Sequence, residues 1–133
     1  MSSFDSVRQK IRVKQIMRNS IISVDSFATA ADAAKMMEDA GVGVVIVLEN
    51  NLPVGIVTDR DFAIKITAHS YPLDTPVRRI MSSPLISIDS DSDLWEASDL
   101  MSTRNIRKLP VIDDDKVVGI LTSSDLVKHV ADN

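Results

Sequence analysis

A short motif occurs twice in this chain, as GIVTDRD at residues 55–61 and as GILTSSD at residues 119–125. The two threonines are 64 positions apart (122 − 58 = 64), and so are the two final aspartates (125 − 61 = 64). Residues 13–62 and 77–126 can be laid over one another at this offset without a gap. This repetition restricts the fold more than local propensity does, because both copies should form the same supersecondary unit.

Both copies carry the signals of one helix at matching positions. Thr29 and Asp93 are N-cap residue types, and each is followed three positions later by a carboxylate residue. Gly41 and Asn105 occupy the matching slots where the two helices should end. Glycine and asparagine best tolerate the left-handed backbone conformation that follows a helix. The two copies therefore predict equivalent helices between these caps.

The expected fold is α/β (α+β), with two β-α-β-β-α units, because short apolar runs flank each predicted helix and the turns ENN and DDD predict hairpins. A unit of about 60 residues buries too little surface to be comfortably stable alone. We therefore expect the two units to pack sheet to sheet with pseudo-two-fold symmetry, with two equivalent clefts between them. The strands are expected at 21–26, 44–48, 53–57, 85–90, 109–112 and 117–121, and the final helices at 61–66 and 125–130.

Composition argues against several functional classes. The net charge of −4 disfavours a general nucleic-acid binder, which needs a basic surface. The absence of cysteine removes disulfides, thiolate metal sites and thiol nucleophiles. Apolar runs are all shorter than the roughly 18–20 residues that span a membrane, and the N-terminal segment lacks the apolar stretch of a signal peptide. We therefore expect a cytoplasmic protein without membrane contact.

The repeated Thr-x-x-Asp pattern has two interpretations. It can be a capping box, in which the hydroxyl and the carboxylate satisfy backbone N–H groups at the start of a helix. The same helix end can instead bind a phosphate, and a carboxylate there can accept the paired hydroxyls of a ribose. Gly55 and Gly119, which precede the motifs, allow close approach either of a ligand or of a tightly packed strand, and the second is commoner.

The two copies resemble cystathionine β-synthase (CBS) domains, and the pair is similar to a Bateman module. The resemblance rests on the ordered segments VKQIM, GVGVVIVLENNLPVGIVTDRD, VRRIM and NIRKLPVIDDDKVVGILTSSD. It implies a non-enzymatic regulatory module that binds adenosine-containing ligands, such as AMP, ADP, ATP or S-adenosylmethionine, between the repeats and signals to an unknown regulated protein. The adenosine ligand would be an effector, and no cofactor is required. The corresponding organisation is an N-terminal extension at 1–12, repeat 1 at 13–66, a linker at 67–76 and repeat 2 at 77–130.

The resemblance also implies roles for individual residues. Asp61 and Asp125 would hold ribose hydroxyls, while Thr58 and Thr122 would meet phosphate. The base would slide between aliphatic walls. These walls would be Ile22, Val42 and Ile120 for the site of Asp125, and Ile86, Ile106 and Ile56 for the site of Asp61.

The two copies differ where family members often place basic phosphate contacts. The second copy has Arg107 and Lys108 there, whereas the first copy has Gly43 and Val44. The site of Asp125 is therefore expected to bind phosphorylated adenosine more tightly than its twin.

Other polar residues do not predict chemistry of their own. His69 and His129 lack carboxylates at metal-ligand spacing, so no metal site is expected, and no motif supplies a catalytic nucleophile with its base. Trp95 replaces Ala31 of the first copy and would be either partly buried or an anchor in a homodimer. The family's helix-mediated association favours a homodimer. The alternative function is a ligand-free dimeric scaffold in which Thr-x-x-Asp only caps helices.

Overall fold

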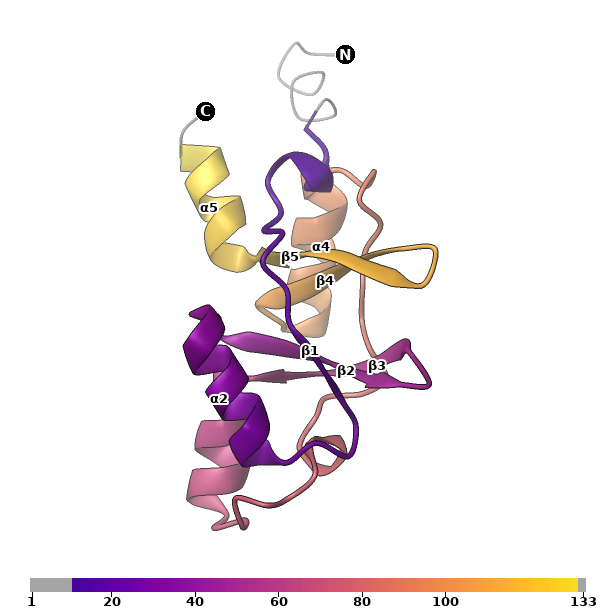
Figure 1. Ribbon diagram of the computed structural model, residues 1–133. Helices are drawn as coiled ribbons and strands as arrows, with labels where there is room; N and C mark the ends of the chain where they lie inside the picture. Colours follow the sequence, from indigo (N-terminus) through magenta and orange to yellow (C-terminus); the bar gives the residue numbers. More distant parts are fainter. Residues whose placement is uncertain (1–10, 132–133) are drawn as a thin grey trace, which may run out of the picture. The chain divides into compact units, whose positions relative to one another are not determined.

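The computed structural model describes residues 11–131, which fall into two compact units (Figure 1). Unit 2 is the continuous segment Ser20–Leu85, whereas unit 1 combines the chain up to Asn19 with the chain from Ile86 onward. The predicted N-terminal extension at 1–12 lies mostly outside the described residues. Each unit is built mainly from one sequence copy and receives a short segment from the other.

Unit 2 contains a three-stranded sheet in the order β1-β2-β3. β1 pairs in parallel with β2, and β2 pairs antiparallel with β3. The buried core includes Val45, Val47 and Val57 from the sheet, and Ala33 and Met37 from α2. The elements of unit 2 are β1 (Ser23–Asp25), α2 (Ala30–Ala40), β2 (Val44–Glu49), β3 (Leu52–Thr58), α3 (Asp59–Asp61), the π-helix η2 (Phe62–Ala68) and the 3-10 helix η3 (Val77–Arg79).

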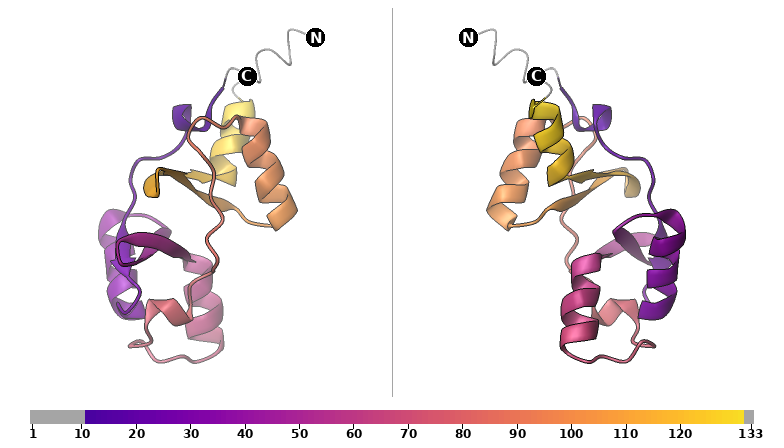
Figure 2. Two further views of the ribbon diagram at one scale, coloured as in Figure 1. Left: turned by 90° about the vertical axis from the view of Figure 1, so that its right-hand side faces the viewer. Right: turned by 90° about the vertical axis from the view of Figure 1, so that its left-hand side faces the viewer.

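Unit 1 contains the antiparallel pair β4–β5 and two helices that lie next to one another in both views of Figure 2. Its buried core joins Leu109, Val111 and Leu121 of the sheet to Met101 of α4, and it also includes Val13 from the N-terminal segment. The elements of unit 1 are the 3-10 helix η1 (Val13–Gln15), α4 (Leu94–Arg104), β4 (Lys108–Asp113), β5 (Lys116–Thr122) and α5 (Ser123–Ala131).

The helix caps predicted from the sequence are confirmed. Thr29 Oγ1 accepts the N–H of Asp32 at 3.1 Å, and a carboxylate oxygen of Asp93 accepts the N–H of Glu96 at 2.9 Å. Gly41 and Asn105 both adopt the left-handed conformation, with φ values of 67° and 53°. Equivalent caps therefore begin and end α2 and α4.

The two hairpin turns are confirmed as well. Asn50 and Asn51 have φ values of 51° and 65°, and Asp114 and Asp115 have values of 50° and 65°. Two consecutive residues with positive φ are typical of the tight turn that suits the twist of a hairpin, and Asn and Asp tolerate it. The turn therefore explains Asp114 and Asp115 of the acidic run, whereas Asp113 is the last residue of β4.

The prediction of a strand at residues 85–90 is wrong. This segment forms only an isolated parallel bridge between Ile88 and Val111. In unit 2, Ile46 donates its N–H to the oxygen of Ile22. The matching position in unit 1 is Pro110, which has no N–H to donate. At the other end, the N–H of Ser90 is bound by the side chain of Asp113 at 3.0 Å rather than by a backbone carbonyl. The backbone hydrogen bonding between residues 85–90 and β4 is therefore shortened at both ends.

The leading segments of the two sequence copies are exchanged between the units. Val13 donates its N–H to the oxygen of Ser92 at 2.8 Å in unit 1. The equivalent Val77 donates to the oxygen of Ala28 at 2.8 Å in unit 2. The predicted linker at 67–76 also packs within unit 2, where Thr75 is buried. The sequence repeats and the compact units thus have different boundaries.

The final helix of the first copy also differs from the expectation. The predicted helix at 61–66 begins as the short α3 and continues as the π-helix η2. The corresponding α5 of the second copy is α-helical throughout its nine residues. Among residues 11–131, every helix is too short or too polar to cross a bilayer.

Candidate functional site

The second Thr-x-x-Asp motif lies where β5 ends and α5 begins. The N–H of Thr122 donates to Asp125 Oδ2 at 3.1 Å, and the N–H of Asp125 donates to Thr122 Oγ1 at 3.1 Å. These reciprocal bonds are those of a capping box. They fix the carboxylate of Asp125 against the start of the helix, so the capping interpretation describes the local geometry correctly.

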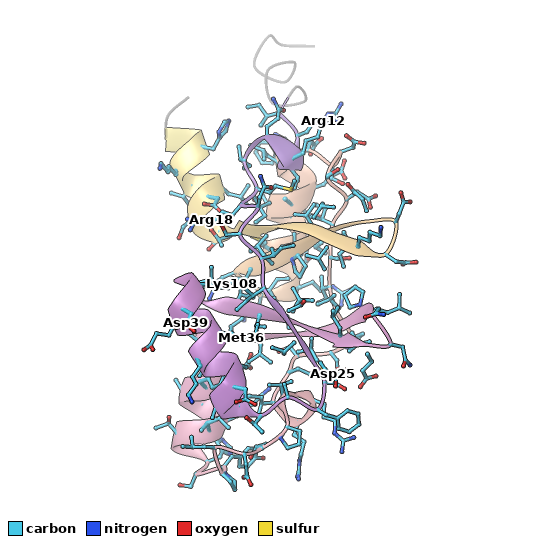
Figure 3. All side chains as sticks on the ribbon, in the orientation of Figure 1. Arg12, Arg18, Asp25, Met36, Asp39 and Lys108 are labelled. Carbon is cyan, nitrogen blue, oxygen red and sulfur yellow. The ribbon has the colours of Figure 1, made fainter. Side chains whose placement is uncertain are left out.

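Arg18 places a guanidinium group on the same carboxylate. Its Nε and Nη2 atoms both lie 3.1 Å from Asp125 Oδ1. The side chain of Asp125 is only 12% exposed, whereas that of Arg18 is 65% exposed. Figure 3 shows Arg18 reaching from the N-terminal segment to the start of α5. The site therefore combines residues that are far apart in the sequence.

Backbone pairing explains how Arg18 reaches Asp125. Arg18 and Ile120 exchange N–H···O bonds of 2.8 and 2.9 Å, an isolated antiparallel bridge that holds the N-terminal segment beside β5. This environment changes the pKa of the Asp125 carboxyl group. Burial acts to raise the pKa of Asp125, but the hydrogen bonds from Arg18 and Thr122 outweigh it and hold the pKa below its ordinary value. Asp125 is therefore a firmly ionised acceptor.

Two further basic residues lie at the start of the neighbouring strand, because Lys108 is the first residue of β4 and Arg107 directly precedes it. Lys108 is the register partner of Thr122 in the β4–β5 pair. The oxygen of Arg107 accepts the N–H of Ser123 at 2.9 Å, which brings the backbone of Arg107 against the first turn of α5. Arg107 is exposed, and Lys108 (Figure 3) is half-buried. The start of α5 is thus bordered by basic residues on both neighbouring segments.

Unit 2 holds the twin motif with a different cation. The N–H and the Oγ1 of Thr58 lie 2.8 and 3.3 Å from Asp61 Oδ2. The Nζ of Lys65 lies 3.3 Å from Asp61 Oδ1 and donates to the oxygen of Ile80 at 2.7 Å. Asp61 is 13% exposed, as shielded as Asp125. Gly43 and Val44 stand beside Thr58, so the neighbouring strand contributes no charge.

The residues predicted for the two sites are divided between the units. Within unit 1, Ile120 is buried next to the Thr122 motif, and within unit 2, Ile56 is half-buried on β3. The other four predicted wall residues belong to the unit opposite to the motif that they were assigned to, so their role stays a prediction. These are Ile22 and Val42 in unit 2, and Ile86 and Ile106 in unit 1.

Sequence reasoning missed both cations that hold the carboxylates. Lys65 had a local signal, because it follows Asp61 by four positions and such pairs face each other on a helix. Arg18 had none, since 107 positions separate it from Asp125. Comparison of the copies does reveal that Arg18 corresponds to Ser82 at the offset of 64 (82 − 18 = 64), a difference in charge without an obvious local meaning.

Comparison with known proteins decides the family. The family model of the CBS domain matches this chain twice, at residues 13–67 and 77–132. The protein belongs to the CBS-domain family. The two matched segments confirm a tandem pair of CBS domains and its mixed α/β fold, as predicted from the repeated segments.

Relatives of this CBS pair occur in bacteria and archaea. The chain is 36% identical over 121 residues to the CBS domain-containing protein YhcV of Bacillus subtilis, covering 91% of this chain and 86% of that protein. It is 37% identical over 123 residues to an uncharacterised protein of Methanopyrus kandleri, covering 90% of this chain but only 63% of that relative.

Solved structures of related proteins show the same fold. An uncharacterised conserved protein from Pyrococcus horikoshii superposes with a TM-score of 0.83 at 28% identity, covering 92% of this chain and 93% of that chain. A hexameric CBS-CP12 protein from bloom-forming cyanobacteria also gives a TM-score of 0.83 at 28% identity, covering 88% of this chain and 66% of that chain.

Proposed function

We propose that this CBS pair is a non-enzymatic regulatory module that binds an adenosine-containing ligand at the start of α5 and signals its presence to a partner protein. The observation that carries the proposal is the composition of this helix N-terminus. The shielded carboxylate of Asp125 is hydrogen-bonded there to Thr122 and to the guanidinium of Arg18. Two more basic residues, Arg107 and Lys108, border the same helix end. Carboxylate and cations together match the two polar parts of a nucleotide.

Each polar part has a suitable partner in unit 1. The carboxylate of Asp125 is 12% exposed, so water competes weakly for its oxygens, which can accept ribose hydroxyls. The helix N-terminus favours an anion, and Arg and Lys side chains form strong charge-assisted hydrogen bonds to phosphate. Arg107 and Lys108 border this helix end. These features support a phosphorylated adenosine as the ligand class.

The same reasoning makes the site of Asp61 the weaker one. Its carboxylate is equally shielded, but the strand beside Thr58 offers Gly43 and Val44 instead of basic residues. The Lys65 ammonium is shared with the oxygen of Ile80. We therefore propose that the ligand occupies the site of Asp125 first.

Thermal-shift measurements test the proposal. A ligand that binds only the native state adds RT ln(1 + [L]/Kd) to the free energy of unfolding, about 2.7 kcal/mol at a hundredfold excess over Kd. The panel should contain AMP, ADP, ATP, S-adenosylmethionine, NAD and adenosine dinucleotides. At least one of them should raise the melting temperature. Nucleotide hydrolysis that disappears in an Asp125→Asn variant would contradict the non-enzymatic part of the proposal.

A scaffold without ligand is the second candidate function. It is favoured by the hydrogen bonds of both motifs, because Thr122 and Asp125, like Thr58 and Asp61, already satisfy one another as helix caps. Unchanged melting curves across the whole panel would favour this function instead. The two candidates therefore give opposite results in one experiment.

We further propose that the protein forms a homodimer through α4 and α5. An open groove of about 270 Å³ lies along these helices and is lined by the apolar residues Met101, Ile106, Leu126 and Val127 together with three serines. Trp95 on α4 is 48% exposed, and Trp is enriched at the centres of protein interfaces. The hexameric assembly named for a cyanobacterial structural relative agrees with self-association of such modules. Trp95→Ala should shift sedimentation toward the monomer, and unchanged sedimentation would place the contact elsewhere.

A further inference from the structure

The carboxylate of Asp125 is almost saturated with hydrogen bonds before any ligand binds. Its Oδ1 accepts two N–H groups from Arg18, and its Oδ2 accepts the N–H of Thr122. A carboxylate oxygen offers about two lone-pair directions, so Oδ1 is filled and Oδ2 keeps one. A ribose that presents two hydroxyls to this carboxylate must therefore displace Arg18 from Oδ1.

The displaced guanidinium would need another anion. Arg18 uses two of its five N–H donors on Asp125, and the remaining three have no acceptor among residues 11–131. Its side chain is 65% exposed, so it can swing without disturbing the core. A phosphate group accepts an arginine fork through two parallel hydrogen bonds, whereas a neutral nucleoside offers nothing equivalent.

We propose that Arg18 makes the site of Asp125 selective for phosphorylated nucleosides over neutral adenosine. In the empty site Arg18 holds Oδ1 and opposes the ribose. A 5′-phosphate compensates for the displacement by binding the released guanidinium, but adenosine does not. This inference rests on the proposed function of the same site, and it adds the class of ligand that the site prefers and the residue that sets the preference.

The twin site in unit 2 lacks this arrangement. Ser82 forms the bridge with Ile56 that Arg18 forms with Ile120, so an uncharged side chain stands at the matching position. The cation on Asp61 is Lys65, which the oxygen of Ile80 also anchors at 2.7 Å. The lysine therefore keeps one acceptor when it leaves the carboxylate, and it depends less on a phosphate.

Calorimetric titration of wild type, Arg18→Ala and Arg79→Ala with AMP and with adenosine tests the inference. Wild type should bind AMP more tightly than adenosine, and Arg18→Ala should lower that ratio by about tenfold, the size expected for lost hydrogen bonds to a charged group. Part of the change should come from tighter binding of adenosine, which no general loss of structure can produce. Arg79→Ala removes a positive charge from another exposed arginine, in unit 2, and should leave the ratio unchanged.

Two outcomes would overturn the inference. If wild type binds AMP and Arg18→Ala keeps the wild-type ratio, the selectivity does not come from Arg18, while the proposed function survives. If wild type binds neither AMP nor adenosine, the selectivity inference fails, and the thermal-shift panel decides separately whether the proposed function survives with another adenosine-containing ligand. Arg18→Lys, which keeps the charge but loses the planar fork, provides a second folded variant and should give an intermediate ratio.

Discussion

Replacing Gly119 by valine should lower the free energy of unfolding by about 2–3 kcal/mol, the upper part of the usual range for overpacking. A Cβ at this position would lie 2.6 Å from Met17 Sδ and 2.9 Å from the backbone oxygen of Arg18. The methionine can move, but the carbonyl is held by its bond to the N–H of Ile120. The N-terminal segment must therefore shift away from β5. Urea denaturation followed by circular dichroism measures the loss.

Gly41→Asn is the matched control for this substitution. Gly41 has φ of 67° with no atom near its missing Cβ, and asparagine already occupies the equivalent cap at Asn105. This variant should unfold within about 0.5 kcal/mol of wild type, as surface substitutions usually do. If Gly119→Val were as stable as Gly41→Asn, the N-terminal segment would not pack on β5 as described.

Asp125→Asn should weaken the binding of AMP by about ten- to hundredfold, the range expected when hydrogen bonds to a charged acceptor are lost. Asparagine keeps an oxygen that can cap the N–H of Thr122, so the helix start should persist. What it loses is the negative charge and the second carboxylate oxygen that would accept ribose hydroxyls. Isothermal titration calorimetry on both proteins gives the ratio of dissociation constants.

Asp61→Asn is the matched control, because Asp61 is equally shielded and also binds the N–H of its own threonine. It should change the affinity for AMP far less than Asp125→Asn, since the basic residues border the other site. The reverse result, with AMP binding abolished by Asp61→Asn and intact in Asp125→Asn, would refute the proposed asymmetry. Urea midpoints close to wild type in both variants would exclude unfolding as the cause.

Local signals in the sequence were sufficient for the local structure. Thr29 and Gly41 mark the ends of α2 because capping depends on residues within one or two turns. The hairpin turns at Asn50 and Asp114 follow from residue types that tolerate positive φ. The repeat itself extended these predictions from one copy to the other.

Features that depend on distant partners were not predictable in this way. The exchange of Val13 and Val77 between the units leaves no trace in either segment, because both have the same pattern and each could pack on its own copy. Residues 85–90 do not form a strand because Pro110, the residue that would pair with them, has no N–H to donate, and the sequence itself shows this proline.

Long-range contacts of Gly119 and of the Asp125 site could not be predicted from the sequence either. The sequence left open whether Gly119 accommodates a ligand or a packed segment, and the contact with Met17 favours the packed segment. The motif placed Asp125 at a helix start, but only the bridge between Arg18 and Ile120 brings the guanidinium to it. Long-range pairing therefore supplies the residue on which the selectivity proposal depends.

Amide proton–nitrogen correlation spectra recorded during a titration with AMP test the central claim most directly. If the nucleotide binds where α5 begins, the amide signals of Thr122 to Asp125 should shift saturably, and those of Arg107 and Lys108 should shift with them. In Asp125→Asn the same shifts should need about ten- to hundredfold more AMP, in line with its weaker binding. Saturable shifts confined to other parts of the chain, or no shifts at millimolar AMP, would contradict a nucleotide site at this helix N-terminus.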